Sequence, residues 1–348
     1  MSNTTSQAGV VAAASPLARE VYMSVAIQEA LAEEMDRDPS VFLLGEEIGV
    51  WGGAYNVTGG LLERYGPMRV FDTPISEAAI AGAAVGAALT GCRPVAEFMF
   101  SDFMGIAMDQ IANQAAKNRY MFGGKAKLPI VYRAPFGAVG GNAAQHSQSP
   151  EAWFTHVPGL KVVTSSTPYD AKGLLKSAIR DDNVVIFFEH KALYAVRGHV
   201  PTGEYTIPLG VADVKRTGTD VSVMTYARQV QYALEAAEAL AAEGISVEVV
   251  DLRTLYPLDI ATVLASVRKT HRAVVVHESV KFGGFGGEIA AQIQEQAFDS
   301  LDGPVLRVGA QHSPVPFSEP LEKRHFPDPQ RIASAVRQVL TALPANMT

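Results

Sequence analysis

The sequence predicts two α/β domains, each built on a doubly wound, mostly parallel sheet with helices on both faces. Short apolar runs alternate with amphipathic stretches from Arg19 to about Glu189, and again from Val221 onward. The strand-like runs are continuously apolar, which is typical of strands buried on both faces of a sheet. Between these two regions the alternation stops, and Pro and Gly residues gather as they do in connectors.

We therefore expect a disordered N-terminal tail over 1–18, a first domain over 19–195, a linker over 196–220 and a second domain over 221–343. The tail is rich in Ser, Thr and Ala and carries no charged side chain. It lacks the basic start of a secretory signal and the arginines of a mitochondrial presequence, so we expect a cytoplasmic protein.

Composition excludes several classes of protein. With 48% apolar and 19% charged residues among 348, the chain can bury a large core and is not disordered as a whole. Its net charge of −7 argues against bulk attraction to nucleic acid or anionic lipid. No apolar run approaches the roughly 18 residues of a membrane span. The single cysteine, Cys92, cannot form an intrachain disulfide.

The elements of the first domain follow from apolar periodicity and from cap residues. Ser76 is a candidate N-cap for a helix that ends near Gly91, since Ser and Gly prefer opposite helix ends. The expected helices are Glu20–Asp36, Ser76–Leu89, Ser101–Tyr120 and Pro168–Arg180. The expected strands are Val41–Leu44, Val70–Phe71, Pro94–Phe98, Ile130–Arg133, Val162–Val163 and Val184–Phe188.

The second domain repeats the alternation of strand and helix. Its expected strands are Val221–Thr225, Val247–Val250, Ala273–His277 and Val305–Val308. Its expected helices are Gln229–Glu243, Asp259–Thr270, Gly284–Phe298 and Pro329–Leu343.

A glycine-rich run, Gly283–Gly287, follows a predicted strand and opens a predicted helix, where a dinucleotide-binding turn belongs. However, Ile289 stands where the third glycine of that fingerprint should be, and the strand is the third of its domain rather than the first. A tight loop explains the run better than a nicotinamide site. A Walker phosphate loop, a paired-histidine zinc helix and a serine nucleophile elbow are missing, and the eight histidines lack metal-ligand spacing.

The segment Asp72–Glu77 leaves a strand and enters a helix made almost wholly of small residues. Gly82 and Gly86 lie on one face of that helix, and small faces let helices approach closely, as in a subunit contact. Glu77 falls in the first turn, where the helix dipole favours a carboxylate. Either Glu77 only stabilises the helix, or it has a chemical role.

Two further candidates stand in glycine-rich loops. Glu46 follows a predicted strand directly, at the carboxyl end where α/β sheets bind ligands. His146 follows a glycine-rich stretch in a polar loop, where a histidine can serve as an acid, a base or a hydrogen-bond donor. A solvated acid and a surface histidine are the alternatives.

These segments together resemble the β subunit of the thiamin-diphosphate-dependent component of 2-oxo acid dehydrogenase complexes. The resemblance extends from about Arg19 to Leu340. It implies a transketolase-like pyrimidine-binding domain followed by a transketolase C-terminal domain. The motifs that carry it are Phe42-Leu43-Leu44-Gly45-Glu46-Glu47, Asp72-Thr73-Pro74-Ile75-Ser76-Glu77, Gln145-His146-Ser147-Gln148, Pro158-Gly159-Leu160-Lys161-Val162-Val163 and Val250-Asp251-Leu252-Arg253-Thr254.

The resemblance implies a role for each candidate. Glu77 matches the acid that hydrogen-bonds the aminopyrimidine ring nitrogen of thiamin diphosphate. Phe103 matches an aromatic residue that packs on the pyrimidine, and Glu46 matches a pocket acid that assists proton movement. His146 matches the histidine that steers the acyl group toward the lipoyl arm. It also implies a structural potassium site formed by Ile130, Ala178, Ile179, Asp181 and Asn183.

The chain contains no Gly-Asp-Gly, the start of the motif that binds magnesium in thiamin enzymes. The resemblance therefore implies that a separate α subunit holds Mg and the diphosphate, in an α2β2 heterotetramer with the active site between subunits. It implies that the C-terminal domain serves β–β contact and docking to a dihydrolipoyl acyltransferase core, with no catalysis of its own.

Three segments lean toward the acetoin-cleaving branch of the family, although His146–Ala152 also resembles the branched-chain form. We therefore expect cleavage of acetoin or of a 2-oxo acid such as pyruvate, with acetoin slightly favoured. A nicotinamide oxidoreductase and a non-catalytic scaffold subunit are the other hypotheses. The three segments are Tyr120-Met121-Phe122-Gly123-Gly124-Lys125, Phe188-Glu189-His190-Lys191 and His312-Ser313-Pro314-Val315-Pro316-Phe317-Ser318.

Overall fold

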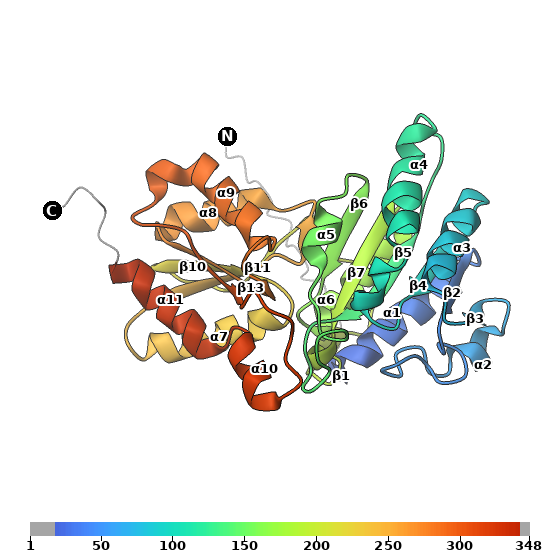
Figure 1. Cartoon of the computed structure of the whole chain (residues 1–348), viewed down its shortest axis with the longest axis horizontal. Coiled ribbons are helices and arrows are strands. Elements are labelled where there is room, and N and C mark those ends of the chain that lie inside the picture. Colours follow the sequence, from blue (N-terminus) through green and yellow to red (C-terminus); the bar gives the residue numbers. More distant parts are fainter. Residues whose placement is uncertain (1–17, 342–348) are drawn as a thin grey trace, which may run out of the picture.

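The computed structural model describes residues 18–341, which form two α/β units side by side (Figure 1). The first unit is built on a seven-stranded sheet in which all neighbours pair in parallel except β12 and β6. The predicted α/β class with parallel sheets is confirmed. In spatial order the strands are β12 (Thr254–Tyr256), β6 (Leu160–Thr164), β7 (Val184–His190), β5 (Val131–Phe136), β4 (Arg93–Glu97), β2 (Val41–Gly45) and β3 (Val70–Asp72).

Both faces of this sheet are covered because its strands alternate apolar side chains between two cores. Leu43 and Val185 belong to one hydrophobic cluster, and Leu44 and Ile186 to another. The first cluster holds α1 (Met23–Arg37) and α6 (Pro168–Arg180) against the sheet. The second receives α3 (Glu77–Leu89) and α5 (Glu151–Thr155).

The second unit has a five-stranded sheet that is parallel except for β9. Its strands, in spatial order, are β14 (Leu306–Ala310), β13 (Ala273–Val280), β10 (Val221–Thr225), β11 (Val247–Asp251) and β9 (Asp213–Arg216). The helices α7 (Arg228–Ala241) and α11 (Pro329–Thr341) pack on one face, and α8 (Ile260–Thr270) and α9 (Gly286–Ala297) on the other.

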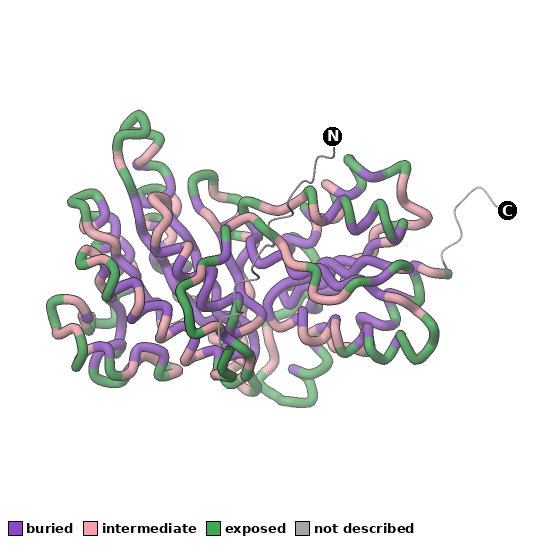
Figure 2. The backbone as a smooth tube through the Cα atoms, turned by 180° about the vertical axis from the view of Figure 1, so that it is seen from behind, coloured by how far each residue is buried: buried purple, intermediate pink, exposed green. Residues whose placement is uncertain are grey.

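The two units share a core, and one strand crosses from the second half of the chain to the first sheet. One hydrophobic cluster contains both Ile186 in β7 and Met224 in β10, and buried residues lie in both units (Figure 2). Strand β12 comes from the second half of the chain but pairs with β6 of the first sheet. Strand β8 (Arg197–Pro201) lies in the predicted linker and pairs antiparallel with β1 (Ala18–Tyr22).

Two details of the first unit differ from the sequence-based expectation. The described part of the chain begins with β1 rather than with a helix at Glu20, because Arg19 to Tyr22 pair with β8. The Ser76 hydroxyl makes no cap hydrogen bond, although Ser76 is the N-cap residue of α3. The predicted tail over 1–18 lies outside the described residues, except for Ala18.

The predicted helix Ser101–Tyr120 is a broken series of helical turns. It consists of a 3₁₀ segment η1 (Ser101–Gly105), a π segment η2 (Gln110–Ala115) and a terminal helix α4 (Ala116–Met121). Such departures from regular α geometry often accompany functional sites. Periodicity also missed the short helices α2 (Leu61–Tyr65), α5 and α10 (Glu319–His325).

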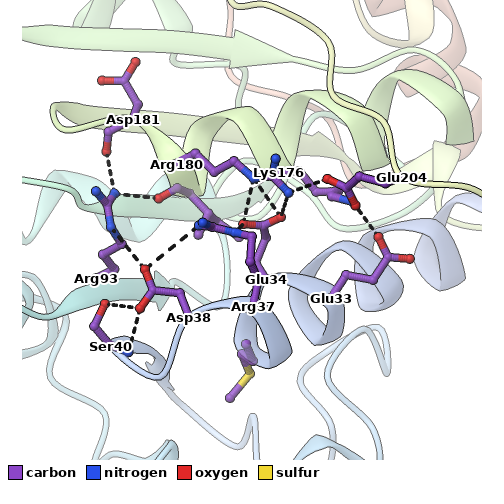
Figure 3. A network of polar contacts seen from close by, with 12 residues as sticks. Glu33, Glu34, Arg37, Asp38, Ser40, Arg93, Lys176, Arg180, Asp181 and Glu204 are labelled. Atoms are coloured by element: carbon purple, nitrogen blue, oxygen red, sulfur yellow. Dashed lines mark hydrogen bonds and ion pairs between the residues drawn. The ribbon is translucent and has the colours of Figure 1, made fainter.

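Ion pairs tie α1 to α6 beneath the first sheet (Figure 3). Lys176, whose side chain is fully buried, lies 2.6 Å from Glu33 and 2.5 Å from Glu204. Arg180 pairs with the buried Glu34 at 2.5 Å. Because buried cations are costly without partners, these contacts fix the two helices against each other.

Candidate functional site

Two buried carboxylates stand next to each other at the carboxyl edge of the first sheet. Glu46 follows β2 directly, and Glu77 is the first residue of α3, which follows the neighbouring strand β3. Each is 6% exposed. Burial raises the pKa of Glu46 above its usual range, and the nearby charge of Glu77 raises it further. Oε1 of Glu46 is buried and has no hydrogen-bond partner among the described residues.

An unpaired buried carboxylate oxygen is energetically unfavourable unless something outside the chain bonds to it. A carboxyl whose pKa is raised binds a proton more readily than a solvated one, and when protonated it can donate as well as accept. The Glu46–Glu77 pair can thus bind a polar nitrogen-bearing group and exchange a proton with it. The structure brings these two predicted residues together.

The other two predicted residues also lie together, in an aromatic cluster. The His146 ring packs edge-on against Phe103 at 5.4 Å and against Phe100 at 5.0 Å between ring centroids. Phe103 lies in η1, which follows the carboxyl end of β4. His146 is therefore fixed beside an aromatic surface that the broken helix presents at this edge of the sheet.

Lys191 is a site residue that the sequence reasoning did not assign a role. Its ammonium lies 4.9 Å from the centre of the Phe100 ring and donates to the backbone carbonyl of His146. Burial lowers the pKa of Lys191 to about 8, although the carboxylates of Asp102, Glu278 and Glu322 oppose that shift.

A buried ionic network supports the same edge of the sheet. Arg133 in β5 lies 2.5 Å from Glu97 of β4 and 2.7 Å from Glu189 of β7. Tyr194 donates to Glu189 at 2.8 Å. Burial raises the pKa of Glu97 despite Arg133. The sequence signal was a carboxylate at or near the carboxyl end of a mostly apolar strand. Glu97 ends β4, and Glu189 is the last residue but one of β7.

The five residues proposed to bind potassium lie at the opposite edge of the sheet. Ile130 and Asn183 precede β5 and β7, whereas Glu46 follows β2, so the two sites occupy opposite ends of parallel strands. Arg93 donates to the carbonyl oxygens of Ile179, at 3.0 Å, and Asp181, at 3.1 Å (Figure 3). Each carbonyl oxygen keeps a second lone pair beside the guanidinium contact. The potassium site stays a prediction.

The glycine-rich turn before α9 packs against a histidine. A Cβ at Gly284 would lie 2.4 Å from the carbonyl oxygen of Val280, and one at Gly286 would lie 2.5 Å from the His277 ring. Burial lowers the pKa of His277 to about 4. Close packing against His277 and the backbone therefore explains both glycines, which favours the tight-loop interpretation over a nicotinamide site.

Within residues 18–341, no group of three His, Cys, Asp or Glu side chains is arranged to hold a metal ion. Over the same residues, no helix has the length and apolar character needed to cross a membrane.

Comparison with known proteins identifies the family of both domains. Residues 19–197 match the transketolase pyrimidine-binding domain, and residues 210–332 match the transketolase C-terminal domain. A solved structure titled "Split gene transketolase, inactive beta4 tetramer" has a TM-score of 0.77 and 25% identity, covering 93% of this chain and 99% of that one. The chain therefore belongs to the transketolase-like family.

Three curated relatives identify a narrower group within this family. The chain is 53% identical to the acetoin:2,6-dichlorophenolindophenol oxidoreductase subunit beta of Cupriavidus necator, covering 93% of this chain and 98% of that protein. It is 47% identical to a pyruvate dehydrogenase E1 component subunit beta from Gracilaria tenuistipitata, with coverage of 92% and 99%. It is also 47% identical to the 2-oxoisovalerate dehydrogenase subunit beta of Bacillus subtilis, with coverage of 90% and 97%. Within the transketolase-like family, the chain belongs with these dehydrogenase β subunits.

Proposed function

We propose that this chain is the β half of a thiamin-diphosphate-dependent oxidoreductase that cleaves acetoin or a 2-oxo acid and passes the acyl group to a lipoyl domain. The single observation that carries the proposal is the buried Glu46–Glu77 pair, with one carboxylate oxygen lacking a partner. The family membership supports it, because all three relatives described above are β subunits of such dehydrogenases.

The residues present suit the pyrimidine half of the cofactor. Its aminopyrimidine offers nitrogen donors and acceptors, and Glu46 and Glu77 offer carboxyl oxygens buried from water. When bound, the cofactor supplies the electron sink for breaking a carbon–carbon bond next to a carbonyl. Glu77 would share a proton with the ring nitrogen, and Glu46, whose pKa is raised, would assist proton movement.

The aromatic cluster has a separate role in the proposal. Phe103 packs on the pyrimidine, and His146 orients the acyl group toward the lipoyl arm. The edge-on contact of these two rings supports this assignment, because it fixes the imidazole close to the cofactor-binding side chain.

We further propose that an α subunit holds Mg and the diphosphate and completes the active site in an α2β2 heterotetramer. The missing Gly-Asp-Gly supports this division. The proposed partner of the assembly is a dihydrolipoyl acyltransferase core. Potassium bound at the Asp181 carbonyl and its neighbours would be structural. We also propose a cytoplasmic location and the domain division 19–195, 196–220 and 221–343, with a disordered tail over 1–18.

Acetoin is the substrate that we favour slightly over pyruvate and branched-chain 2-oxo acids. The identity of 53% to the Cupriavidus necator subunit, against 47% to the pyruvate and 2-oxoisovalerate relatives, supports this order. The difference is small, so the experiment compares all three substrates.

The test is reconstitution with the α subunit encoded beside this chain. Dichlorophenolindophenol reduction is measured with thiamin diphosphate and magnesium, using acetoin, pyruvate and 3-methyl-2-oxobutanoate in turn. Turnover in the mixture, but with neither subunit alone, is the expected result, and the preferred substrate identifies the branch. A stable complex without turnover on any of the three would favour a non-catalytic scaffold.

A further inference from the structure

The loop that carries His146 is held by side chains of the second unit. This loop (residues 137–149, the His146 loop) connects β5 to α5. Glu278 in β13 accepts a hydrogen bond from the backbone N–H of Ala138 at 2.7 Å. Arg228, the first residue of α7, donates to the carbonyl oxygen of Ala138 at 3.2 Å. The beginning of the loop is therefore bound through both of its backbone groups.

A second carboxylate binds the middle of the loop. Glu322 in α10, at the boundary between the two units (Figure 1), accepts from the N–H of Gly140 at 3.0 Å and from that of Gly141 at 2.8 Å. Both glycines have positive φ, +83° and +72°. Consecutive N–H groups in such a conformation can converge on one anion, and a side chain at either position would be strained.

The hydrogen bond from the N–H of Ala138 to Glu278 is charge-assisted. Nδ1 of His190 accepts from the N–H of Ala192 at 3.2 Å, so the ring proton lies on Nε2 and donates to Glu278 at 2.9 Å. Burial acts to raise the pKa of Glu278, but the contact with His190, the positive charge of Arg228 and the N–H of Ala138 together hold it below its usual range. Glu278 is therefore an ionised carboxylate with two donors, and hydrogen bonds to charged groups are stronger than neutral ones.

Apolar packing alone does not fix the loop. A cavity of about 690 Å³ separates part of the loop from the second unit, and is lined by Ser147 and Gln148 on one side and by Glu278, Phe282 and His312 on the other. Glu278 and Glu322 bind the first half of the loop, at residues 138–141, whereas Lys191 of the first unit holds the carbonyl oxygen of His146 itself. The second unit therefore fixes the segment from which the loop leads to His146.

We infer that Glu278 and Glu322 are positioning residues of the second unit, which set the location of the His146 loop and so place the imidazole for acyl transfer. This inference rests on the proposed function of His146. It adds a role for the C-terminal domain in the reaction, beyond subunit contact and docking. Neither carboxylate is catalytic, because each contacts only the loop backbone and neighbouring side chains.

The test compares two acids on the same helix. Glu322→Gln keeps the size of the side chain but replaces one of the two accepting oxygens with an amide NH₂, which cannot accept from a loop N–H group. The control is Glu319→Gln, which changes an exposed acid that pairs with Lys323 on the surface. In the reconstituted α/β complex, Glu322→Gln should lower kcat for acetylation of an isolated lipoyl domain about tenfold. The KM for the small substrate should change less than twofold. Glu319→Gln should behave as wild type.

Hydrogen exchange supplies a readout independent of turnover. Amides of the His146 loop should exchange at least about tenfold faster in Glu322→Gln, because the two N–H groups lose a charged acceptor. Glu322→Ala should have a larger effect. Unchanged exchange and unchanged kcat in both variants would overturn the inference.

His146→Ala separates the two proposals. If it impairs lipoyl acylation while Glu322→Gln and Glu322→Ala do not, the positioning inference is wrong and the proposed function stands. If wild-type complex fails to turn over, the proposed function fails. In that case, the hydrogen-exchange rates of the loop amides alone show whether Glu322 holds the loop.

Discussion

Arg133 and Glu189 form a fork of two parallel hydrogen bonds inside the first sheet, Nε to Oε1 at 2.7 Å and Nη2 to Oε2 at 2.8 Å. The remaining guanidinium nitrogen, Nη1, binds Glu97 at 2.5 Å. One cation thus links three neighbouring strands, β4, β5 and β7. Planar bidentate pairs of this kind fix geometry as well as charge.

Removing that cation should be costly. Arg133→Met leaves the carboxylates of Glu97 and Glu189 buried without their partner, and we expect a loss of about 3–5 kcal/mol of stability. Urea unfolding measures it. Arg197→Met, which removes an exposed pair with Glu20, is the matched control and should cost no more than about 1 kcal/mol. Equal effects of the two substitutions would show that the buried bridge is not structural.

Glu77→Gln tests the proton-holding carboxyl. The amide keeps the size of the side chain but cannot share a proton with the cofactor ring, so the activity of the reconstituted complex should fall by at least about 100-fold. Dye reduction measures the loss, and circular dichroism checks the fold. Glu63→Gln, at an exposed position in α2, should retain full activity. Full activity in Glu77→Gln would contradict the proposed role.

Glu151 gives a pH-dependent prediction. Burial raises its pKa to about 8, while Tyr226 donates to it at 2.6 Å. The folded protein therefore retains this proton between about pH 4.5 and 8, whereas the unfolded chain releases it. The resulting stabilisation is complete below pH 4.5 and is lost as the pH rises toward 8.

Glu151→Gln mimics the protonated acid and removes this dependence. The variant should gain stability relative to wild type by about 1 kcal/mol per pH unit across that range. Thermal unfolding at a series of pH values measures the difference between the two proteins. A difference that stays constant from pH 5 to 8 would show that Glu151 is ionised in the folded protein.

Potassium should raise thermal stability if the site at the amino edge of the sheet binds it. At a concentration of roughly 100 times the dissociation constant, the stabilisation is about 2.7 kcal/mol. Unfolding in potassium chloride is compared with sodium and choline chloride at equal ionic strength. Asp181→Ala keeps the carbonyl oxygen but removes the side chain that accepts from the N–H of Asn183, so it should loosen this turn and reduce the difference. Identical melting in all three salts would refute the site.

Much of the fold could be predicted from sequence, because buried parallel strands are long apolar runs and their helices are amphipathic. Val221–Thr225 and Pro168–Arg180 were predicted to the residue. Segments governed by distant contacts were not. Strand β12 depends on pairing with β6, and the break in Ser101–Tyr120 depends on packing at the sheet edge, neither of which leaves a periodic pattern.

In the candidate site, too, residues at strand ends could be predicted, whereas residues brought in by distant contacts could not. Glu46 and Glu77 follow neighbouring strands, so their proximity could be expected from the position of strand ends. Lys191 and Glu322 reach the His146 loop from segments 45 and about 180 residues away. A single sequence gives no sign of such contacts.

The edge strand β12 affects how the two halves of the polypeptide behave when they are produced separately. It pairs with β6, which would otherwise be the last strand of the seven-stranded sheet. A fragment ending in the connector would expose the N–H and C=O groups of β6 to any free strand, and open edges of this kind promote aggregation. The first half of this polypeptide should therefore aggregate when it is expressed without the second half.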